Sequence, residues 1–588
     1  MSAAADRASA AIAQGNLITA YDQTASAIAD GDNSIEIRYQ QVLALARMGH
    51  TDRATELFQS YGLDRSDDPH QQAIGARLLK DKALALQLGV ARDEALRAAA
   101  NAYLTIFTMS DDPFPGINAA SLAALSNDET TAQRIAGEIL SIPAVAEPKD
   151  YFMAATRAEA FLVLGKIDES AASLQLAAGL SGDDNGARST TCRQITLVAA
   201  HLGLDRAATD QLLLPVRPAS VIHFCGHIFN CDIETEVSIH LAIDKILADL
   251  DIGFAFGSLA AGADILIAEA VLKRGGGLHV VLPFAIEDFI AQSVRPAGEP
   301  WVKRFERCMA AATSCVMATE MVYVGDPQQF AYASRVAMGL ATLRAQHLGN
   351  VPRQLTIWDG TSSEGPAGTS ADIAAWRAQG GQTLVVHPGT VTRAITPPTK
   401  LNEADHERAL VALLFTDFQG FSMLKEVALP KFWEGVMRSI ADVLDEHSDM
   451  VLCRNSWGDA LFAVAASATG AAEIALALQD RLCGQDYRAL GIIEGGGMRI
   501  AVHYGPVYRM LDPITQRTNF YGSEVSRAAR IEPVTPPGAV FVTEPFAAIL
   551  ALEAPKLFQC KYAGRIELAK RYGTYPMYRL KRIQMSIA

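Results

Sequence analysis

The spacing of apolar residues changes twice along this chain, and each change implies a different kind of core. Up to residue 212 the sequence is rich in Ala and Leu at helical spacing. From 215 to 390 short β-branched runs alternate with helical stretches, and beyond 406 apolar strands carry Gly-containing turns. A helix buries one stripe and a strand one face, so the zones need different layer architectures. The sequence therefore predicts a multidomain protein, as its 588 residues also require.

Charge and cysteine usage exclude several classes of function. The net charge of −14 disfavours non-specific binding to nucleic acid or to an anionic membrane surface. None of the eight cysteines forms a CxxC pair, so no zinc ribbon or redox motif is indicated. The sequence shows neither a signal-peptide pattern nor an apolar run long enough to span a membrane. We expect a cytoplasmic protein with no nucleic-acid and no membrane partner.

The first zone, residues 1–212, repeats a helix–Gly–helix design. It is clearest in QVLALARMGHTDRATELFQSYGL, broken at Gly49, and in AEAFLVLGKIDESAASLQLAAGL, broken at Gly165. The pattern resembles tetratricopeptide hairpins, which stack into a solenoid because one hairpin cannot bury its own apolar face. An ordinary helical bundle is the alternative. No chemistry is evident, so we expect a scaffold or a surface for a protein partner.

The second zone, residues 215–390, alternates predicted strands with helices. This pattern favours a Rossmann-like, doubly wound parallel sheet, which binds ligands at the carboxyl ends of its strands. The predicted strands cover residues 220–227, 252–258, 278–284, 321–326, 355–360 and 383–388.

One loop of this zone has the composition of a ligand site. In FAFGSLAAGADILIAEAVLKRGGGLHVVLPF a strand runs into Gly257 and Ser258, then Gly262 and Asp264 open a helix whose N-terminal amides could approach a phosphate. The segment resembles the SLOG superfamily, although the PGGxGT-type loop of its hydrolases is absent. We therefore predict a sensor of a nucleotide-derived ligand rather than a hydrolase, the alternative being a spacer without ligand. Residues 391–405 then read as a linker.

The third zone, residues 406–588, carries the catalytic candidates. In ALVALLFTDFQGFSML an apolar strand ends at Asp417, and the chain then turns through Gly420 into a predicted helix. Asp459 lies in the Gly-Asp turn of the hairpin VLCRNSWGDALFAV. Two carboxylates on neighbouring strands can hold two metal ions on one triphosphate.

Four motifs in this zone together resemble the class III nucleotidyl cyclase catalytic domain. They are FTDFQGFS, GDA, RIAVHYGPV and YGSEVSRAARIEPVTPPGAVFVTE, and the similarity runs from about 409 to 582. The resemblance implies an α+β, ferredoxin-like fold and a head-to-tail homodimer with its sites at the interface. It also implies two Mg²⁺ or Mn²⁺ ions per site and a nucleoside triphosphate substrate.

The resemblance assigns a role to each matching residue. Asp417 and Asp459 match the metal ligands, and Arg530 matches the arginine that stabilises charge at the α-phosphate. The residues expected to contact the triphosphate are Phe418, Gly420, Phe421, Arg499, and Lys570 or Arg571.

Three positions depart from the family pattern. Asn455 and Asn519 stand where adenylate cyclases place lysine and aspartate and guanylate cyclases place glutamate and cysteine. Each amide both donates and accepts, so the pair suits adenine in one orientation and guanine or a pyrimidine in another. Ser526 replaces the usual ribose-orienting asparagine, and we expect reduced turnover from it.

Three hypotheses follow from the sequence. The first is an adenylate cyclase that makes 3′,5′-cyclic AMP and pyrophosphate from ATP under control of the preceding domains. The second is a cyclase specific for guanine or a pyrimidine, supported by the asparagine pair. The third is a non-catalytic nucleotide-binding receptor.

Overall fold

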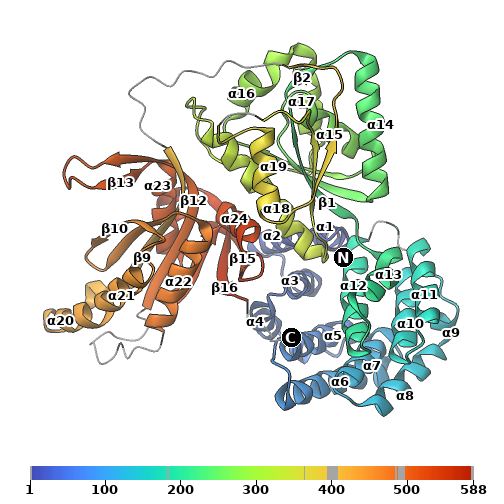
Figure 1. Cartoon of the computed structure of the whole chain (residues 1–588). Helices are drawn as coiled ribbons and strands as arrows, with labels where there is room; N and C mark the ends of the chain where they lie inside the picture. Colours follow the sequence, from blue (N-terminus) through green and yellow to red (C-terminus); the bar gives the residue numbers. More distant parts are fainter. Residues whose placement is uncertain are drawn as a thin grey trace. The chain divides into compact units, whose positions relative to one another are not determined.

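The computed structural model describes residues 3–180, 182, 184–362, 365–393, 408–483, 487 and 497–583. The chain divides into two compact units. The first holds residues 1–218 with 347–349, and the second holds 219–346 with 350–583 (Figure 1). Within the described ranges, no helix is both long enough and apolar enough to cross a bilayer.

The first unit is helical, as the sequence predicted. Both glycine breaks are confirmed: Gly49 and Gly165 have left-handed φ angles of 77° and 72° and separate α3 from α4 and α10 from α11. The helices are α1 (Ala3–Ala13), α2 (Leu17–Ala29), α3 (Ile35–Arg47), α4 (Thr51–Ser60), α5 (Pro69–Leu84), α6 (Val90–Ser110), α7 (Pro113–Leu125), α8 (Glu129–Leu140), α9 (Pro143–Ala146), α10 (Tyr151–Val163), α11 (Ile167–Leu180), α12 (Asn185–His201) and α13 (Arg206–Leu213).

The second unit begins with a parallel six-stranded sheet in the order β5-β4-β3-β1-β6-β7, which confirms the doubly wound prediction. Alternate residues of the strands face opposite sides. Ile222 and Phe224 join the core under α14, α15 and α17, whereas His223 stacks on Trp376 of α19. The strands are β1 (Ser220–Gly226), β3 (Ile252–Gly257), β4 (Gly277–Leu282), β5 (Ser314–Met317), β6 (Arg353–Ile357) and β7 (Thr383–Val386). The helices are α14 (Ile233–Asp249), α15 (Ala263–Lys273), α16 (Ile286–Phe289), α17 (Glu299–Ala311), α18 (Gln328–Leu348) and α19 (Thr369–Ala378).

Two predictions for this region were wrong. Residues 321–326 form no strand, because side chains occupy their amides: Tyr323 N donates to Asp288 Oδ2 (2.8 Å) and Val324 N donates to Gln329 Oε1 (3.2 Å). The strand at that edge is β5 instead. The predicted linker also begins too early, since β8 (Thr392–Arg393) pairs with β2 (Phe229–Asn230); residues 394–405 lie outside the described part.

The second sheet has eight strands in the order β10-β11-β9-β12-β14-β16-β15, with β13 paired to β12. Its central strand β9 runs antiparallel to both β11 and β12. The strands are β9 (Arg408–Gln419), β10 (Val451–Trp457), β11 (Ala460–Ala465), β12 (Gly497–Leu511), β13 (Thr518–Tyr521), β14 (Val540–Thr543), β15 (Phe558–Glu567) and β16 (Thr574–Arg582). The helices are α20 (Leu429–Phe432), α21 (Arg438–Glu446), α22 (Ala468–Leu482), α23 (Ser523–Ile531) and α24 (Glu544–Glu553).

Two sequence features that favour turns lie inside strands of this sheet. Gly505 and Pro506 stay within β12, where Pro506 lies opposite Leu410 of β9. On the other side of β12, β14 pairs with residues 500–502 and β13 with residues 508–511, so the missing N–H of Pro506 interrupts no ladder there. Asn519 lies within β13.

Helix α18 joins the two sheets of the second unit. Tyr332 is fully buried and its hydroxyl donates to Tyr504 O on β12 (2.7 Å). Arg408 of β9 pairs with Asp326 at 3.1 Å, and both side chains are nearly inaccessible to solvent. Gly339 lies directly against α24, where an added Cβ would stand 2.1 Å from Ala548 O.

This close approach predicts the effect of one methyl group. Gly339→Ala should lower the free energy of unfolding by about 1–3 kcal/mol, because the Cβ must push α24 away. The control is Gly137→Ala in α8, where an added Cβ meets open space, so alanine should stabilise the helix by up to about 1 kcal/mol. Chemical denaturation measures both, and equal stabilisation by the two substitutions would contradict the packing described.

Candidate active site

Strand β9 brings the two predicted metal ligands together. Asp417 lies two residues before its end, opposite Arg499 of β12, and Arg499 Nη2 donates to Asp417 Oδ2. On the other edge of β9, the β10–β11 turn places Asp459 where its Oδ2 accepts a hydrogen bond from Phe418 N (3.1 Å). The two aspartates thus lie on neighbouring strands, as the sequence predicted.

A third carboxylate, which the sequence analysis missed, stands beside the pair. Glu532 follows α23, and its Oε1 lies 2.7 Å from Arg499 Nε. Burial and the charge of Asp417 raise the pKa of Asp459 to about 6. Burial likewise raises the pKa of Glu532 to about 7, against the opposing effect of Arg499. The site therefore holds one guanidinium group and three carboxyl groups, and this surplus of acidic groups attracts a cation.

The donor set fits a hard divalent metal. Carboxylate oxygens are the ligands that Mg²⁺ and Mn²⁺ prefer, and Mg²⁺ commonly takes only one or two of them with phosphate and water oxygens completing the shell. In the described residues, no group of three or more His, Cys, Asp or Glu side chains is arranged to hold a metal by itself. Asp417 and Asp459 are thus suited to a metal that arrives with a phosphorylated substrate.

The loop after β9 is held by aromatic packing. Phe418 is 1% exposed and its ring lies 5.2 Å from that of Phe432, while Phe421 lies 5.0 Å from the same ring. The strand predicted to end at Asp417 runs on to Gln419, because Phe418 must reach this cluster. After Gly420 (φ 97°) the chain forms only a 3₁₀ turn, Phe421–Met423, rather than the predicted helix. With the rings of Phe418 and Phe421 packed against Phe432, the loop can present backbone groups.

The two asparagines expected to read the base lie side by side. Asn455 of β10 donates through Nδ2 to Asn519 Oδ1 of β13 (3.4 Å), and the same oxygen accepts a hydrogen bond from Phe520 N (2.9 Å). In this orientation Asn455 keeps its own carbonyl oxygen for a ligand. The hydrogen bonds around each asparagine side chain determine which end of the amide is taken as oxygen and which as nitrogen.

Helix α23 carries Ser526 and Arg530 one turn apart, on the same side of the helix. Ser526 is exposed and Arg530 is half-buried. Within the described residues, no hydrogen bond or ion pair joins Arg530 to Asp417 or Asp459. Arg530 thus makes no direct polar contact with either aspartate in the described part of the chain.

A buried network, absent from the sequence analysis, fixes α23 to the sheet. His503 of β12 contacts Glu524 Oε2 through Nε2 (2.7 Å) and Thr543 through Nδ1 (2.8 Å), and Arg527 lies 3.1 Å from the same Glu524 oxygen. His503 and Glu524 are fully buried. Burial lowers the pKa of His503, so a neutral imidazole beside a charged Glu524 accounts for the contact. A histidine within an apolar strand was the available sequence signal.

Lys570 and Arg571 lie in the exposed connection between β15 and β16, which contacts α23. Both have left-handed backbones, with φ angles of 62° and 56°. Such conformations are strained for side chains with a Cβ and concentrate at ligand-binding loops.

The predicted loop of the middle region borders a cavity of about 400 Å³. Ser258 and Asp264 line it together with His227, Asp372 and Arg393, whereas Gly257 and Gly262 do not. Burial raises the pKa of Asp264 to about 8 and that of Asp372 to about 7.

Three amides around the start of α15 already make hydrogen bonds within the protein. Ala261 N donates to Ser293 O (2.9 Å), Ala263 N donates to His227 O (3.1 Å), and Ala260 N donates to the Asp264 carboxyl group (3.1 Å). Part of the donors of this loop is thus used, and phosphate binding by the remaining amides stays a prediction. The cavity also presents two carboxyl groups that burial favours in the protonated, hydrogen-donating form.

Two family models match the chain. Residues 404–582 match the Adenylate and Guanylate cyclase catalytic domain, and residues 16–123 match Tetratricopeptide Repeats-Sensor. The chain thus has a tetratricopeptide-type domain near its N-terminus and a class III cyclase catalytic domain near its C-terminus. Neither match covers residues 215–390, where the SLOG-like resemblance stays a prediction. No curated protein matches the chain.

Solved cyclase structures are similar to about a third of the chain. The adenylyl cyclase CyaB from P. aeruginosa is 15% identical, with 31% of this chain and 100% of that chain covered and a TM-score of 0.27. The guanylate cyclase domain of RhGC from Catenaria anguillulae, in complex with GTP, is 16% identical, with coverage of 30% and 98% and a TM-score of 0.26. An adenylate cyclase from Trypanosoma brucei, in its monomeric state, is 21% identical, with coverage of 31% and 92% and a TM-score of 0.26.

The buried network under α23 predicts a large loss of stability on truncation. Glu524→Ala should lower the free energy of unfolding by about 3–5 kcal/mol, because His503 and Arg527 are left buried without their anionic partner. Glu473→Ala is the matched control. Its ion pair with Arg582 is about one-third exposed, so we expect a loss of at most about 1 kcal/mol. Similar losses for both variants in chemical denaturation would argue against the role of the network.

Proposed function

Because residues 404–582 form a cyclase catalytic domain, we propose that the protein converts a nucleoside triphosphate, with ATP as the first candidate, to its 3′,5′-cyclic monophosphate. The ribose 3′-oxygen attacks the α-phosphorus, and the bond to pyrophosphate breaks. The observation that supports this best is the meeting of Asp417, Asp459 and Arg499 at the end of β9.

Each residue of the site has a proposed role in this reaction. Asp417 and Asp459 would hold two Mg²⁺ or Mn²⁺ ions, which when bound stabilise phosphate charge and favour ionisation of the 3′-hydroxyl. Arg530 offers a planar donor fork to the α-phosphate as charge develops, and Ser526 orients the ribose. The backbone of Phe418–Phe421 and the Lys570–Arg571 loop bind the remaining phosphates.

We propose that the working unit is a head-to-tail homodimer. The lack of a direct polar contact between Arg530 and the aspartates within the described part of one chain is consistent with this assembly, in which two chains facing each other supply both sets. Each closed interface then contains two sites by symmetry.

The dimer leads to a complementation test. Asp417→Ala and Arg530→Ala should each abolish cyclase activity when alone. Mixed after unfolding and refolding together, they should restore about a quarter of wild-type activity, because half of the dimers are mixed and each has one intact site. Mixing two preparations of Asp417→Ala is the control. If the mixture stays inactive although mixed dimers form, the shared-site model is wrong.

The identity of the base rests on the asparagine pair. Adenine offers an acceptor at N1 and a donor at its amino group, which the pair satisfies if Asn455 donates and Asn519 accepts. The orientation described above leaves the Asn455 oxygen free, and this favours guanine, whose N1–H and amino group both donate. A guanylate cyclase is therefore the second candidate.

Substitution of both asparagines should shift the base preference toward adenine. Asn455→Lys with Asn519→Asp provides a fixed donor and a fixed acceptor. This change should raise the ratio of kcat/KM for ATP over GTP at least about tenfold relative to wild type. Initial rates with ATP, GTP, CTP and UTP, each with Mg²⁺ and with Mn²⁺, provide the measurement. Nucleotide binding without any cyclic product from wild-type protein would indicate a non-catalytic receptor.

We propose that the two preceding regions regulate the cyclase domain. Contacts of α18 with β12 and α24 supply a physical connection from the middle sheet to the catalytic sheet. The protonatable cavity beside Asp264 and Asp372 is the candidate for a regulatory ligand of the middle region.

A further inference from the structure

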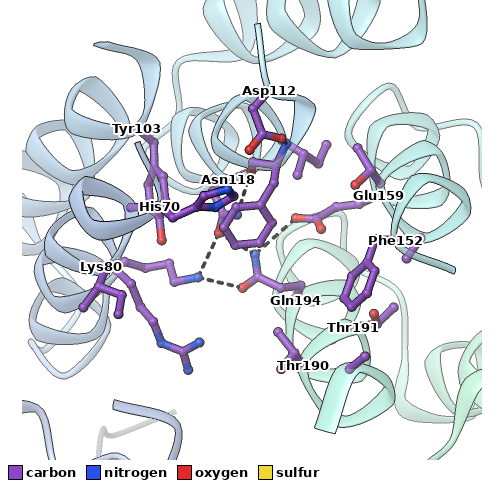
Figure 2. Close-up of a pocket in the computed structure, with 18 of the residues that line it drawn as sticks. His70, Lys80, Tyr103, Asp112, Asn118, Phe152, Glu159, Thr190, Thr191 and Gln194 are labelled. Atoms are coloured by element: carbon purple, nitrogen blue, oxygen red, sulfur yellow. Dashed lines mark hydrogen bonds between the residues drawn. The ribbon is translucent and has the colours of Figure 1, made fainter. Parts of the chain in front are cut away.

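The helical unit encloses a cavity of about 510 Å³ that no family match assigns. Its walls come mainly from alternate helices, α3, α5, α7, α10 and α12, with Tyr103 contributed by α6 (Figure 2). Residues 16–123, which match the tetratricopeptide sensor model, supply only part of this lining, because α10 and α12 lie beyond them. The cavity is within the range of roughly 300–1,000 Å³ that small-molecule sites occupy.

The row of helices closes on itself around this cavity. Helix α12 returns to contact α1, and at its start Gly186 approaches so closely that an added Cβ would lie 2.4 Å from Ile12 O. Further along α12, Arg193 Nη1 donates to Arg47 O at the end of α3 (3.4 Å). An open solenoid presents a long groove, whereas this contact between α1 and α12 bounds the cavity, which stays open to solvent on the side of Phe114 and Phe152. Its shape suits a compact molecule better than an extended peptide.

Three cationic side chains converge on the cavity. Arg47 comes from α3, and Arg77 and Lys80 come from α5. Burial and the charge of Arg77 lower the pKa of Arg47 to about 10, and burial lowers the pKa of Lys80 to about 8. The Nε atoms of both arginines are inaccessible to solvent and make no hydrogen bond within the described residues, although Arg77 Nε lies 3.5 Å from Asp81 Oδ2. Such an unfavourable cluster of charge is relieved by an anion.

The acidic residues of the lining do not neutralise this cluster fully. Asp112 caps α7 by accepting a hydrogen bond from Phe114 N (3.0 Å). Glu159 accepts from Ser121 Oγ (2.5 Å) and from Gln194 Nε2 (3.3 Å), and burial raises its pKa toward the neutral form. Asp81, just outside the lining, reaches Arg77 at 3.5 Å.

The deepest groups are already fixed in position. Lys80 Nζ donates to Asn118 Oδ1 (2.9 Å) and to Gln194 Oε1 (3.3 Å), side chains of α7 and α12 (Figure 2). An ammonium group has three protons, so one is left for a ligand. A donor held by neighbours on two other helices loses little entropy when a ligand binds.

Aromatic rings form the other walls. Tyr39, Tyr103, Phe114 and Phe152 line the cavity, with His70 nearby in the same lining. The Lys80 ammonium lies 5.9 Å from the centre of the Tyr103 ring. The planar rings of ligands stack on aromatic faces of this kind, and the stacking depends little on which ring the ligand carries.

From these observations we propose that the helical unit binds a small phosphorylated molecule with a planar ring, of the size of a nucleoside monophosphate. Arg47, Arg77 and Lys80 receive the phosphate and the aromatic walls hold the ring, while Asn118 and Gln194 keep Lys80 in position. This site is separate from the cyclase centre. It assigns ligand recognition to a region for which the sequence indicated only a scaffold or a surface for a protein partner.

The test is equilibrium binding of fluorescent N-methylanthraniloyl-AMP to the full chain in EDTA, without divalent metal. EDTA suppresses metal-dependent nucleotide binding at the cyclase site, so failure of this proposal is distinguishable from failure of the proposed cyclase activity. Wild type should bind saturably, with displacement by at least one of AMP, GMP, CMP and UMP. Arg77→Ala should weaken binding at least about tenfold, since a charged hydrogen-bond donor is lost.

Arg53→Ala is the matched control, because Arg53 lies on the surface of α4 with 58% of its side chain exposed. Its affinity should stay within about twofold of wild type. If Arg77→Ala does not fold, as judged by circular dichroism, Arg77→Gln replaces it. The proposal is overturned by absent binding, by equal affinity of the Arg77 and Arg53 variants, or by an acidic peptide that displaces the probe better than every nucleotide.

Discussion

The pairing of β9 with β11 on one edge and β12 on the other is the constraint on which the catalytic region depends. It fixes Asp417 opposite Arg499 and lets the β10–β11 turn place Asp459 against the backbone of Phe418. A shift of register by one residue would turn Asp417 to the other face of the sheet. The positions of the proposed metal ligands, of the proposed phosphate loop and of Arg499 on β12 are therefore consequences of one strand alignment.

The same sheet also carries groups that serve the reaction without touching its substrate. The buried contact among His503, Glu524 and Arg527 holds α23, and with it Arg530, to β12 and β14. Farther along β12, the backbone oxygen of Tyr504 accepts a hydrogen bond from the hydroxyl of Tyr332 on α18. A single strand, β12, thus connects the middle sheet, the helix that carries Arg530 and the carboxylates proposed to bind metal. This connection is a physical route for the proposed regulation.

Local patterns predicted the elements well and their ends less well. The glycine breaks at Gly49 and Gly165 were found because a left-handed residue ends a helix whatever surrounds it. The strand predicted at 321–326 was wrong because distant side chains, Asp288 and Gln329, take its amides. The end of β9 was placed too early because burial of Phe418 against Phe432, a contact between separate segments, extends the strand.

The sequence by itself determined the three zones, the cyclase resemblance and the candidate residues, since periodicity and short motifs are properties of neighbouring positions. Only the tertiary structure decided that Glu532 joins the aspartate pair, that Asn455 contacts Asn519, and that some amides around the start of α15 are already occupied. It also decided that Arg47, Arg77 and Lys80 face one cavity. These are contacts between residues far apart in sequence, and packing of whole elements, rather than local preference, sets which side chains meet.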